Sequence, residues 1–320
     1  MNLRELARLA GVSVSTVSKA FHNADDVSEK TKTYIFDIAK QYGCFEKYHL
    51  DRFGKRIFAV ICPELRSYYY ADAVDRLQQV IEADGGLVLI STDGFNRKKQ
   101  AELVEYYAAY LHVDGIFVYG YSGTAATETP IISISGGSAS VDSVVSDLSE
   151  PMQQAVAHLQ SLNHTRIAFI GDRLTQSKAA LFQAAMDASS LPVPETYLVE
   201  SADRFERAGE DGMTRLLALP TPPTAVICAY DYIACGAISH LTRSGLRVPE
   251  DVSVIGMDNI NASQHMDPAL TSIDSGWEQV NRIAWDLMKK KLEDPSYRLR
   301  QKIMLTGQLI LRETTAKAKA

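Results

Sequence analysis

A short run near the N-terminus places hydroxyl side chains and one cation at helical spacing. Ser13 is positioned to cap a helix that begins at Val14. Within that helix Val17 and Phe21 recur at i and i+4, so both are expected to face inward. The outward face then carries Val14, Ser15, Ser18, Lys19 and His22. Small polar residues and a lysine in this arrangement can bond base edges and phosphates in the major groove of DNA.

Two further helices are needed to hold this surface in place. Leu3, Leu6, Ala7 and Ala10 fall on one face of a first helix, and Gly11 can end it with a positive φ. A third helix is capped by Ser28 and carries Ile35, Ile38, Ala39 and Tyr42 on its apolar stripe. The pattern predicts a helix-turn-helix. A three-helix cap without a ligand is the alternative, and the polar outward face of the second helix argues against it.

The charge of the chain is unevenly distributed. The whole sequence of 320 residues has a formal net charge of −6 at pH 7. Lys and Arg nevertheless outnumber Asp and Glu over residues 1–56, so the remainder is strongly acidic. An acidic surface repels phosphate, and therefore only the N-terminal segment is expected to lie on a duplex.

Several segments resemble the LacI/GalR (lactose-repressor) family of bacterial transcription regulators. Residues 7–18 and 27–31 are similar to its DNA-binding head, and residues 223–231, 245–258 and 268–273 are similar to its body. The resemblance implies an N-terminal all-α helix-turn-helix head plus an α/β two-lobed periplasmic-binding-protein-like (type I) body. It also implies a homodimeric repressor that binds double-stranded operator DNA and responds to a small effector, a sugar or related polyol. The DNA-binding residues expected from the pattern and the resemblance are Ser13, Val14, Ser15, Thr16, Ser18, Lys19, His22, Ser28 and Thr31.

Strand and helix patterns alternate from residue 57 onward, which predicts parallel sheets with crossover helices. The pattern restarts after residue 147, so two similar lobes with a cleft between them are expected. We assign residues 1–45 to the head, 46–56 to a hinge, 57–146 with 275–303 to an N-terminal lobe, and 147–274 with 304–316 to a C-terminal lobe.

Ligands of parallel sheets bind beyond the carboxyl ends of the strands, so residues that follow each strand should line the cleft. Aromatic rings and carboxylates gather at these positions, a combination that suits a sugar. The resemblance adds Trp277 as a cleft aromatic and Asp258 as an effector-binding aspartate. Two positions depart from the family: Lys178 stands where it usually has arginine, and Tyr230 stands where asparagine is common. The predicted effector-binding residues are Tyr68, Tyr69, Tyr119, Asp147, Lys178, Tyr230, Asp231, Asp258 and Trp277. Surface tyrosines and satisfied loop aspartates are the alternative for any one of them.

The segment between head and body departs from the family pattern, which has a short hinge helix with a leucine that wedges into the minor groove. Phe53 stands at the wedge position here and is predicted to contact DNA, whereas Glu46 and Asp51 would lie against phosphate. A plain linker is the alternative.

Other classes of function have little support in the sequence. The histidines are scattered, and no nucleophile elbow, phosphate-binding glycine loop or zinc-ligand spacing is present. We therefore expect no enzyme activity, cofactor or metal. No apolar stretch suits a membrane span or a signal region, so a cytoplasmic location is expected. A sugar-binding module with a vestigial head and an enzyme on a two-lobed fold remain as alternatives.

Overall fold

The computed structural model describes residues 1–22, 24–45, 48, 55–121, 123–124, 127–136, 138, 140–294, 296–297 and 299–319. Among these described residues, the N-terminal part holds the helices α1 (Leu3–Ala10), α2 (Val14–Phe21) and α3 (Glu29–Gln41). Their ends are fixed as predicted. The Glu5 N–H donates to Asn2 Oδ1 at 2.9 Å, the Thr16 N–H donates to Ser13 Oγ at 3.0 Å, and Gly11 has φ 65°.

The core of the head is built around Phe21. Val17 and Ile35 are fully buried beside it, and its ring lies 5.0 Å from Phe36 and 5.6 Å from Tyr48, centroid to centroid. Because Tyr48 is buried and its hydroxyl donates to the Met1 carbonyl at 2.8 Å, the packed head extends beyond residue 45, the predicted boundary. Tyr42 is 52% exposed, so its predicted place on the apolar stripe was wrong; it caps the end of α3 and has left the buried face.

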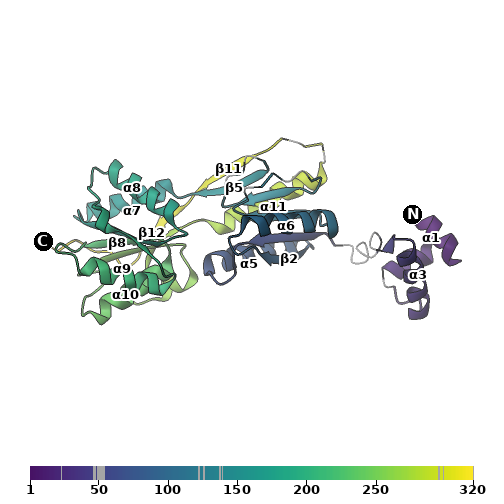
Figure 1. Ribbon diagram of the computed structural model, residues 1–320, viewed down its shortest axis with the longest axis horizontal. Helices are drawn as coiled ribbons and strands as arrows, with labels where there is room; N and C mark the ends of the chain where they lie inside the picture. Colours follow the sequence, from purple (N-terminus) through teal and green to yellow (C-terminus); the bar gives the residue numbers. More distant parts are fainter. Residues whose placement is uncertain are drawn as a thin grey trace. The chain divides into compact units, whose positions relative to one another are not determined.

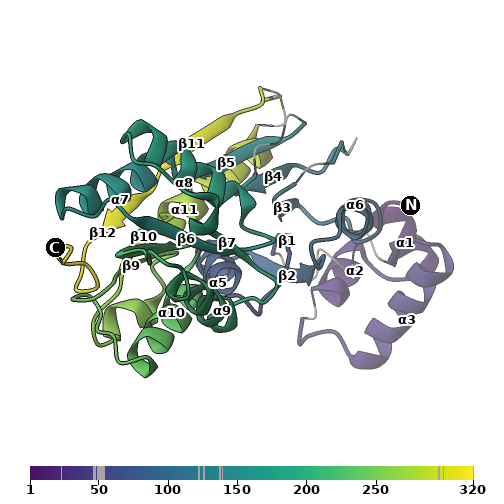
Figure 2. The same ribbon diagram turned by 60° about the vertical axis from the view of Figure 1, so that its left-hand side comes forward.

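The described residues form two sheets, and the first has the strand order β11-β5-β4-β3-β1-β2. Figure 2 shows these strands side by side. The pairs β3–β4, β4–β5 and β5–β11 are parallel. The elements of this lobe are β1 (Ile57–Cys62), α5 (Tyr68–Ala83), β2 (Leu87–Thr92), α6 (Arg97–Glu105), the π-helix η2 (Tyr106–Tyr110), β3 (Gly115–Tyr119), β4 (Ile131–Ile134), β5 (Asp142–Asp147), α11 (Trp277–Glu293) and β11 (Lys302–Thr306).

The second sheet has the order β12-β10-β9-β8-β6-β7, with β12 antiparallel to β10. Its strands read as continuous apolar runs because helices cover both faces of a parallel sheet (Figure 1). The elements of this lobe are α7 (Ser149–Ser161), β6 (Ile167–Asp172), α8 (Gln176–Ala188), the 3-10 helix η3 (Glu195–Tyr197), β7 (Leu198–Ser201), α9 (Glu206–Leu217), β8 (Ala225–Cys228), α10 (Asp231–Arg243), β9 (Ser253–Met257), the 3-10 helix η4 (Asn261–His265), β10 (Thr271–Asp274) and β12 (Gln308–Ile310).

The chain passes between the two sheets at residues 147–149, 274–277 and 306–308. These crossings lie next to β5 and β11, at one edge of the first sheet, and next to β10 and β12, at one edge of the second. Strand β11 pairs with β5 as far as Thr306, so the third crossing falls at Gly307 rather than between residues 303 and 304. All three connections therefore lie on one side of the two-lobed body.

Candidate functional site

The outward face of α2 has the exposure that a groove-reading helix requires. Val14, Ser15, Lys19 and His22 are exposed, and Thr16 and Ser18 are partly buried. Two hydroxyl pairs mark the starts of α2 and α3, because Ser13 Oγ lies 2.8 Å from Thr16 Oγ1 and Ser28 Oγ lies 2.8 Å from Thr31 Oγ1. Hydroxyls and N–H groups at helix N-termini are frequent phosphate ligands. None of the predicted DNA-binding residues that the structure describes is buried; Phe53 lies outside the described residues.

Lys19 does not point freely into solvent. Its ammonium forms an ion pair with Asp26, and both side chains are about half exposed. The lysine lowers the pKa of the Asp26 carboxyl by hydrogen bonding. An exposed pair of this kind contributes little to stability, so Lys19 can exchange Asp26 for an acceptor on DNA at small cost.

A second candidate site is a cavity of about 230 Å³ between the two lobes of the body. This volume lies below the roughly 300–1,000 Å³ of typical ligand pockets, so it suits one small ligand. Residues from both sheets contribute to its wall. They are Ser67, Tyr69, Tyr70, Phe95, Ser135, Asp172, Leu174, Thr175, Ser177, Lys178, Arg204, Tyr230 and Asp258.

Lys178 and Asp258 form an ion pair on the wall of this cavity. Lys178, on α8, donates to Asp258 Oδ1 at 3.2 Å and to the Ala229 carbonyl at 2.7 Å. Burial, with a smaller contribution from the nearby Asp231, raises the pKa of Asp258 to about 7, although Lys178 opposes the shift. The carboxylate is therefore held where it is costly to ionise, a condition typical of binding and catalytic sites.

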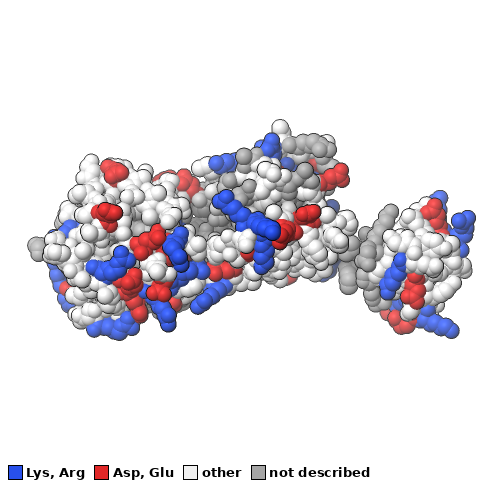
Figure 3. Space-filling model, in the orientation of Figure 1, with Lys and Arg blue, Asp and Glu red and all other residues white. Residues whose placement is uncertain are grey.

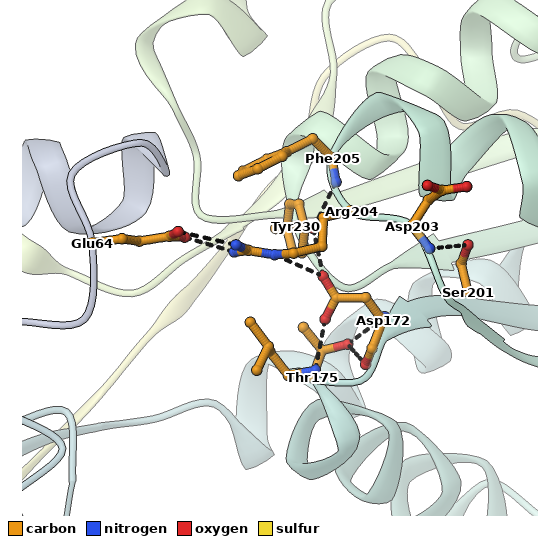
Figure 4. A network of polar contacts seen from close by, with 9 residues as sticks. Glu64, Asp172, Thr175, Ser201, Asp203, Arg204, Phe205 and Tyr230 are labelled. Carbon is orange, nitrogen blue, oxygen red and sulfur yellow. Dashed lines mark hydrogen bonds and ion pairs between the residues drawn. The ribbon is translucent and has the colours of Figure 1, made fainter. Parts of the chain in front are cut away.

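A second polar network surrounds Arg204, which follows β7 (Figure 4). The guanidinium makes a two-bond contact to Glu64, with Nη2 to Oε1 at 2.6 Å and Nη1 to Oε2 at 3.0 Å. Its Nε lies 3.7 Å from Asp172 Oδ2 and has no hydrogen-bond partner among the described residues. Tyr230 donates to the same Asp172 oxygen at 2.7 Å and accepts from the Phe205 N–H at 2.9 Å.

Aromatic rings form the opposite wall. Tyr69, in the first turn of α5, packs edge-on against Trp277 with ring centroids 4.9 Å apart, and its ring lies 5.4 Å from Lys178 Nζ. Tyr70 packs edge-on against Tyr119 at 6.0 Å. Burial raises the pKa values of Tyr69, Tyr70 and Tyr119, so all three hydroxyls remain protonated at neutral pH.

The structure brings four of the nine predicted effector residues to the cavity: Tyr69, Lys178, Tyr230 and Asp258. The structure corrects the prediction that Asp231 binds the effector. It is fully buried, and its carboxylate already accepts from Ser263 Oγ, Ser272 Oγ and the Ile260 N–H, so it cannot receive a ligand hydroxyl. It supports the loop that carries Asp258.

The other four predicted residues lie outside the wall of this cavity. Trp277 is buried behind Tyr69, and Asp147 accepts from Ser149 at the first crossing between lobes. Tyr68 lies at the start of α5. Tyr119 lines a neighbouring cavity of about 200 Å³, which shares Tyr70, Phe95 and Ser135 with the first.

Nine wall residues are absent from the predicted set, among them Phe95, Ser135 and Arg204. Phe95 and Arg204 follow β2 and β7, so the rule of strand ends could have found them. Backbone strain marks the same region, since Phe95, Ser135 and Asp258 have φ of 61°, 62° and 101° and Phe205 has φ 59°. Strained backbone in non-glycine residues clusters at functional sites because surrounding contacts must hold it.

The surface of the body carries charges of both signs. On the face drawn in Figure 3, Lys and Arg are interspersed with Asp and Glu over both lobes rather than gathered into one basic patch. No group of three or more His, Cys, Asp or Glu suited to a metal occurs among the described residues. In the same part of the chain, no helix is long and apolar enough to cross a membrane.

A helix-turn-helix head on a two-lobed α/β body defines a class of DNA-binding regulators, and comparison with known proteins identifies the family. Residues 2–44 match the description "Bacterial regulatory proteins, lacI family", and residues 156–315, half of the chain, match "Periplasmic binding protein-like domain". The chain therefore belongs to the lacI family of bacterial regulatory proteins. This confirms the predicted fold class and a function in transcription regulation.

Individual members support the assignment over nearly the full length. The transcriptional repressor CytR of Escherichia coli K12 is 27% identical, with 98% of this chain and 96% of CytR covered. The lac repressor dimer bound to operator and the anti-inducer ONPF has a TM-score of 0.77 at 22% identity, covering 99% of each chain. A complex of the regulator CelR with cellobiose has a TM-score of 0.69 at 24% identity, covering 98% of this chain and 99% of CelR. These two structures share the fold.

Proposed function

We propose that the chain is a homodimeric repressor whose operator affinity is controlled by a neutral, polyhydroxylated ligand bound between the lobes. The observation that carries this proposal is the inter-lobe cavity, where Lys178 and Asp258 face aromatic rings from the other lobe. Aromatic faces suit the C–H surface of a sugar, and paired charges suit its hydroxyls. The relatives whose names and titles include a repressor and a cellobiose complex are consistent with this proposal.

The charges of the cavity favour a neutral ligand. Its two cations already have carboxylate partners, since Lys178 is paired with Asp258 and Arg204 with Glu64. A sugar acid or sugar phosphate would have to displace one of these carboxylates and leave it unpaired in a partly buried site. A hydroxyl can instead donate to Asp258 and accept from Lys178 without breaking the pair. The side chains of Ser135 and Ser177 offer further hydroxyl partners.

The coupling between ligand binding and operator binding follows from the two-lobed form of the body. A ligand that contacts both lobes favours the arrangement in which they are closed, and it can shift the population only by its difference in affinity for the two arrangements. In a homodimer such a shift changes the spacing of two heads, and heads reach successive major grooves only at about one helical turn of separation.

The first experiment measures binding by the shift in melting temperature. We would compare ribose, glucose and cellobiose with glucuronate and glucose 6-phosphate, each over a concentration series. A neutral sugar is expected to raise the melting temperature. At a concentration one hundred times its dissociation constant, it stabilises the folded protein by about 2.7 kcal/mol. A shift with only the two anionic compounds would contradict the neutral-ligand proposal.

The second experiment follows DNA binding by fluorescence anisotropy with the DNA upstream of the chain's own gene. Asp258→Ala is expected to bind this DNA as the wild type does but to lose the response to the sugar found above. Asp203→Ala is the matched control, because Asp203 is an exposed aspartate of the same lobe outside the cavity wall. A normal response in Asp258→Ala would place the ligand elsewhere, and failure of the wild type to bind any operator would favour a sugar-binding module with a vestigial head.

A further inference from the structure

We infer that Glu64 and Arg204 form a clasp that holds the two lobes together before any ligand binds. This inference goes beyond the proposed function, because it concerns the free protein and does not depend on the ligand. Glu64 follows β1 in the first lobe, and Arg204 follows β7 in the second. Their side chains make two hydrogen bonds, at 2.6 and 3.0 Å (Figure 4). A two-bond contact between arginine and a carboxylate is among the stronger and more directional polar interactions.

The clasp lies on the side of the body away from the three chain crossings. The three chain crossings lie beside β5, β11, β10 and β12, at one edge of each sheet. Strand β7 is the opposite edge strand of the second sheet, and β1 is next to the opposite edge strand of the first. Lobes that are joined on one side separate most on the other side. A bond on that far side is therefore stretched most when the lobes open, and it opposes opening more than a bond near the crossings would.

The second lobe holds Arg204 ready for this contact. The guanidinium lies over the Phe205 ring, with Cζ 4.6 Å from the centroid, and its Nε faces Asp172 at 3.7 Å. Tyr230 links the Phe205 N–H to Asp172 and so fixes the backbone where Phe205 has φ 59°. Ordering a long side chain costs rotamer entropy, and here most of that ordering is done by its own lobe.

Two other contacts between the lobes lie beside the clasp. The Arg204 guanidinium also lies 5.7 Å from the Phe95 ring of the first lobe, and Arg66 of the first lobe lies 5.4 Å from the Phe205 ring of the second. The side chains of Arg204 and Glu64 are only 32% and 18% exposed, so salt screens this pair less than it screens a fully solvated one. Together with the clasp, these ring contacts form one continuous set of interactions between the lobes.

The test measures the distance between spin labels on the two lobes in the ligand-free protein. Labels at Lys98→Cys on α6 and Arg207→Cys on α9 use exposed positions, one in each lobe. With Glu64→Gln or Arg204→Gln, the main distance is expected to shift to longer values. Arg204→Lys keeps the positive charge but cannot make the two-bond contact to Glu64, so it is expected to give an intermediate distance. Raising the salt from about 0.1 to 1 M shortens the Debye length from about 10 to 3 Å. It should lengthen the distance in proteins that keep the pair and leave Glu64→Gln and Arg204→Gln unchanged.

Arg243→Gln is the matched control. It breaks a pair with Glu210 whose shortest distance, 2.7 Å, resembles that of the clasp, but both partners lie in the second lobe. The control is expected to leave the distance unchanged. Distances in Glu64→Gln and Arg204→Gln that equal the wild-type distance would overturn the clasp, whatever sugar the protein binds. The loss of ligand binding in an otherwise normal clasp would instead count against the proposed function alone.

Discussion

Replacing Asp258 with asparagine should make the body more stable at alkaline pH. The substitution keeps the size of the side chain and removes a charge that burial makes expensive. The pKa of Asp258 is raised from 3.8 to about 7, and its side chain is only 7% exposed. Asparagine also tolerates the positive φ of this position better than most residues do.

The expected magnitude follows from the pKa. A group whose folded-state pKa is raised binds its proton more tightly in the folded state, so ionising it costs stability. The cost is absent below the unfolded pKa of about 4 and complete above about pH 7, where the rise of the pKa from 3.8 to about 7 corresponds to ~4 kcal/mol. The raised pKa already includes the attraction of Lys178, so the loss of this charged partner in the variant needs no separate correction. A gain of about 4 kcal/mol raises the melting temperature of a domain of this size by roughly 8–16 °C.

Scanning calorimetry at pH 8 and pH 5 can test this reasoning. The rise in melting temperature should be larger at pH 8, because the wild-type carboxyl is mostly protonated at pH 5. Asp203→Asn, at an exposed site, should change neither value by more than the error of the measurement. If Asp258→Asn melts lower than the wild type at pH 8, the carboxylate stabilises the fold and the reasoning from its burial is wrong.

Three further predictions concern the head, the hinge and the second lobe. Lys19→Ala should weaken operator binding by about 1–3 kcal/mol and relax specificity at one base pair, whereas equal weakening on all sequences would make Lys19 a phosphate contact. Phe53→Ala should reduce operator bending in a circular-permutation assay and leave salt-dependent non-specific binding nearly unchanged; unchanged bending would make residues 46–56 a plain linker. Gly236→Ala should lower the melting temperature strongly, because the new Cβ would lie 1.9 Å from the Glu206 carbonyl oxygen where α9 and α10 cross, and a near-normal value would show that these helices can move apart.

The head could be predicted from sequence nearly residue by residue because its signals are local. Ser13, Ser28 and Gly11 act on their own or the next turn of chain, and the structure has all three where they were expected. Tyr42 was misplaced because it lies four residues after Ile38 and so continues the helical spacing, although the helix has already ended at Gln41. The alternating pattern of the body was equally readable, apart from α6, which continues into a π-helix at Tyr106 that no simple periodicity indicates.

The cavity was predicted only in part because its geometry depends on long-range packing. Strand ends identify candidates but not the direction in which each carboxylate points. Asp231 and Asp258 both follow strands, yet the first is enclosed by Ser263 and Ser272 and the second reaches the cavity. The partner of Arg204 is Glu64, 140 residues earlier in the chain, and no local pattern relates the two.

The features that escape local patterns also carry a cost in stability, and this cost is concentrated around one cavity. Asp258 is a buried carboxylate with a raised pKa, and Phe205 has an unfavourable φ. The buried Nε–H of Arg204 lies 3.7 Å from Asp172 and has no hydrogen-bond partner among the described residues. A protein selected for stability alone would lose each of these by a single substitution. A ligand that bonds to Asp258 and Lys178 reduces the first cost only in the closed arrangement, since the cavity wall comes from both lobes. The difference in affinity that drives a switch can therefore arise from the same charges that weaken the unliganded fold.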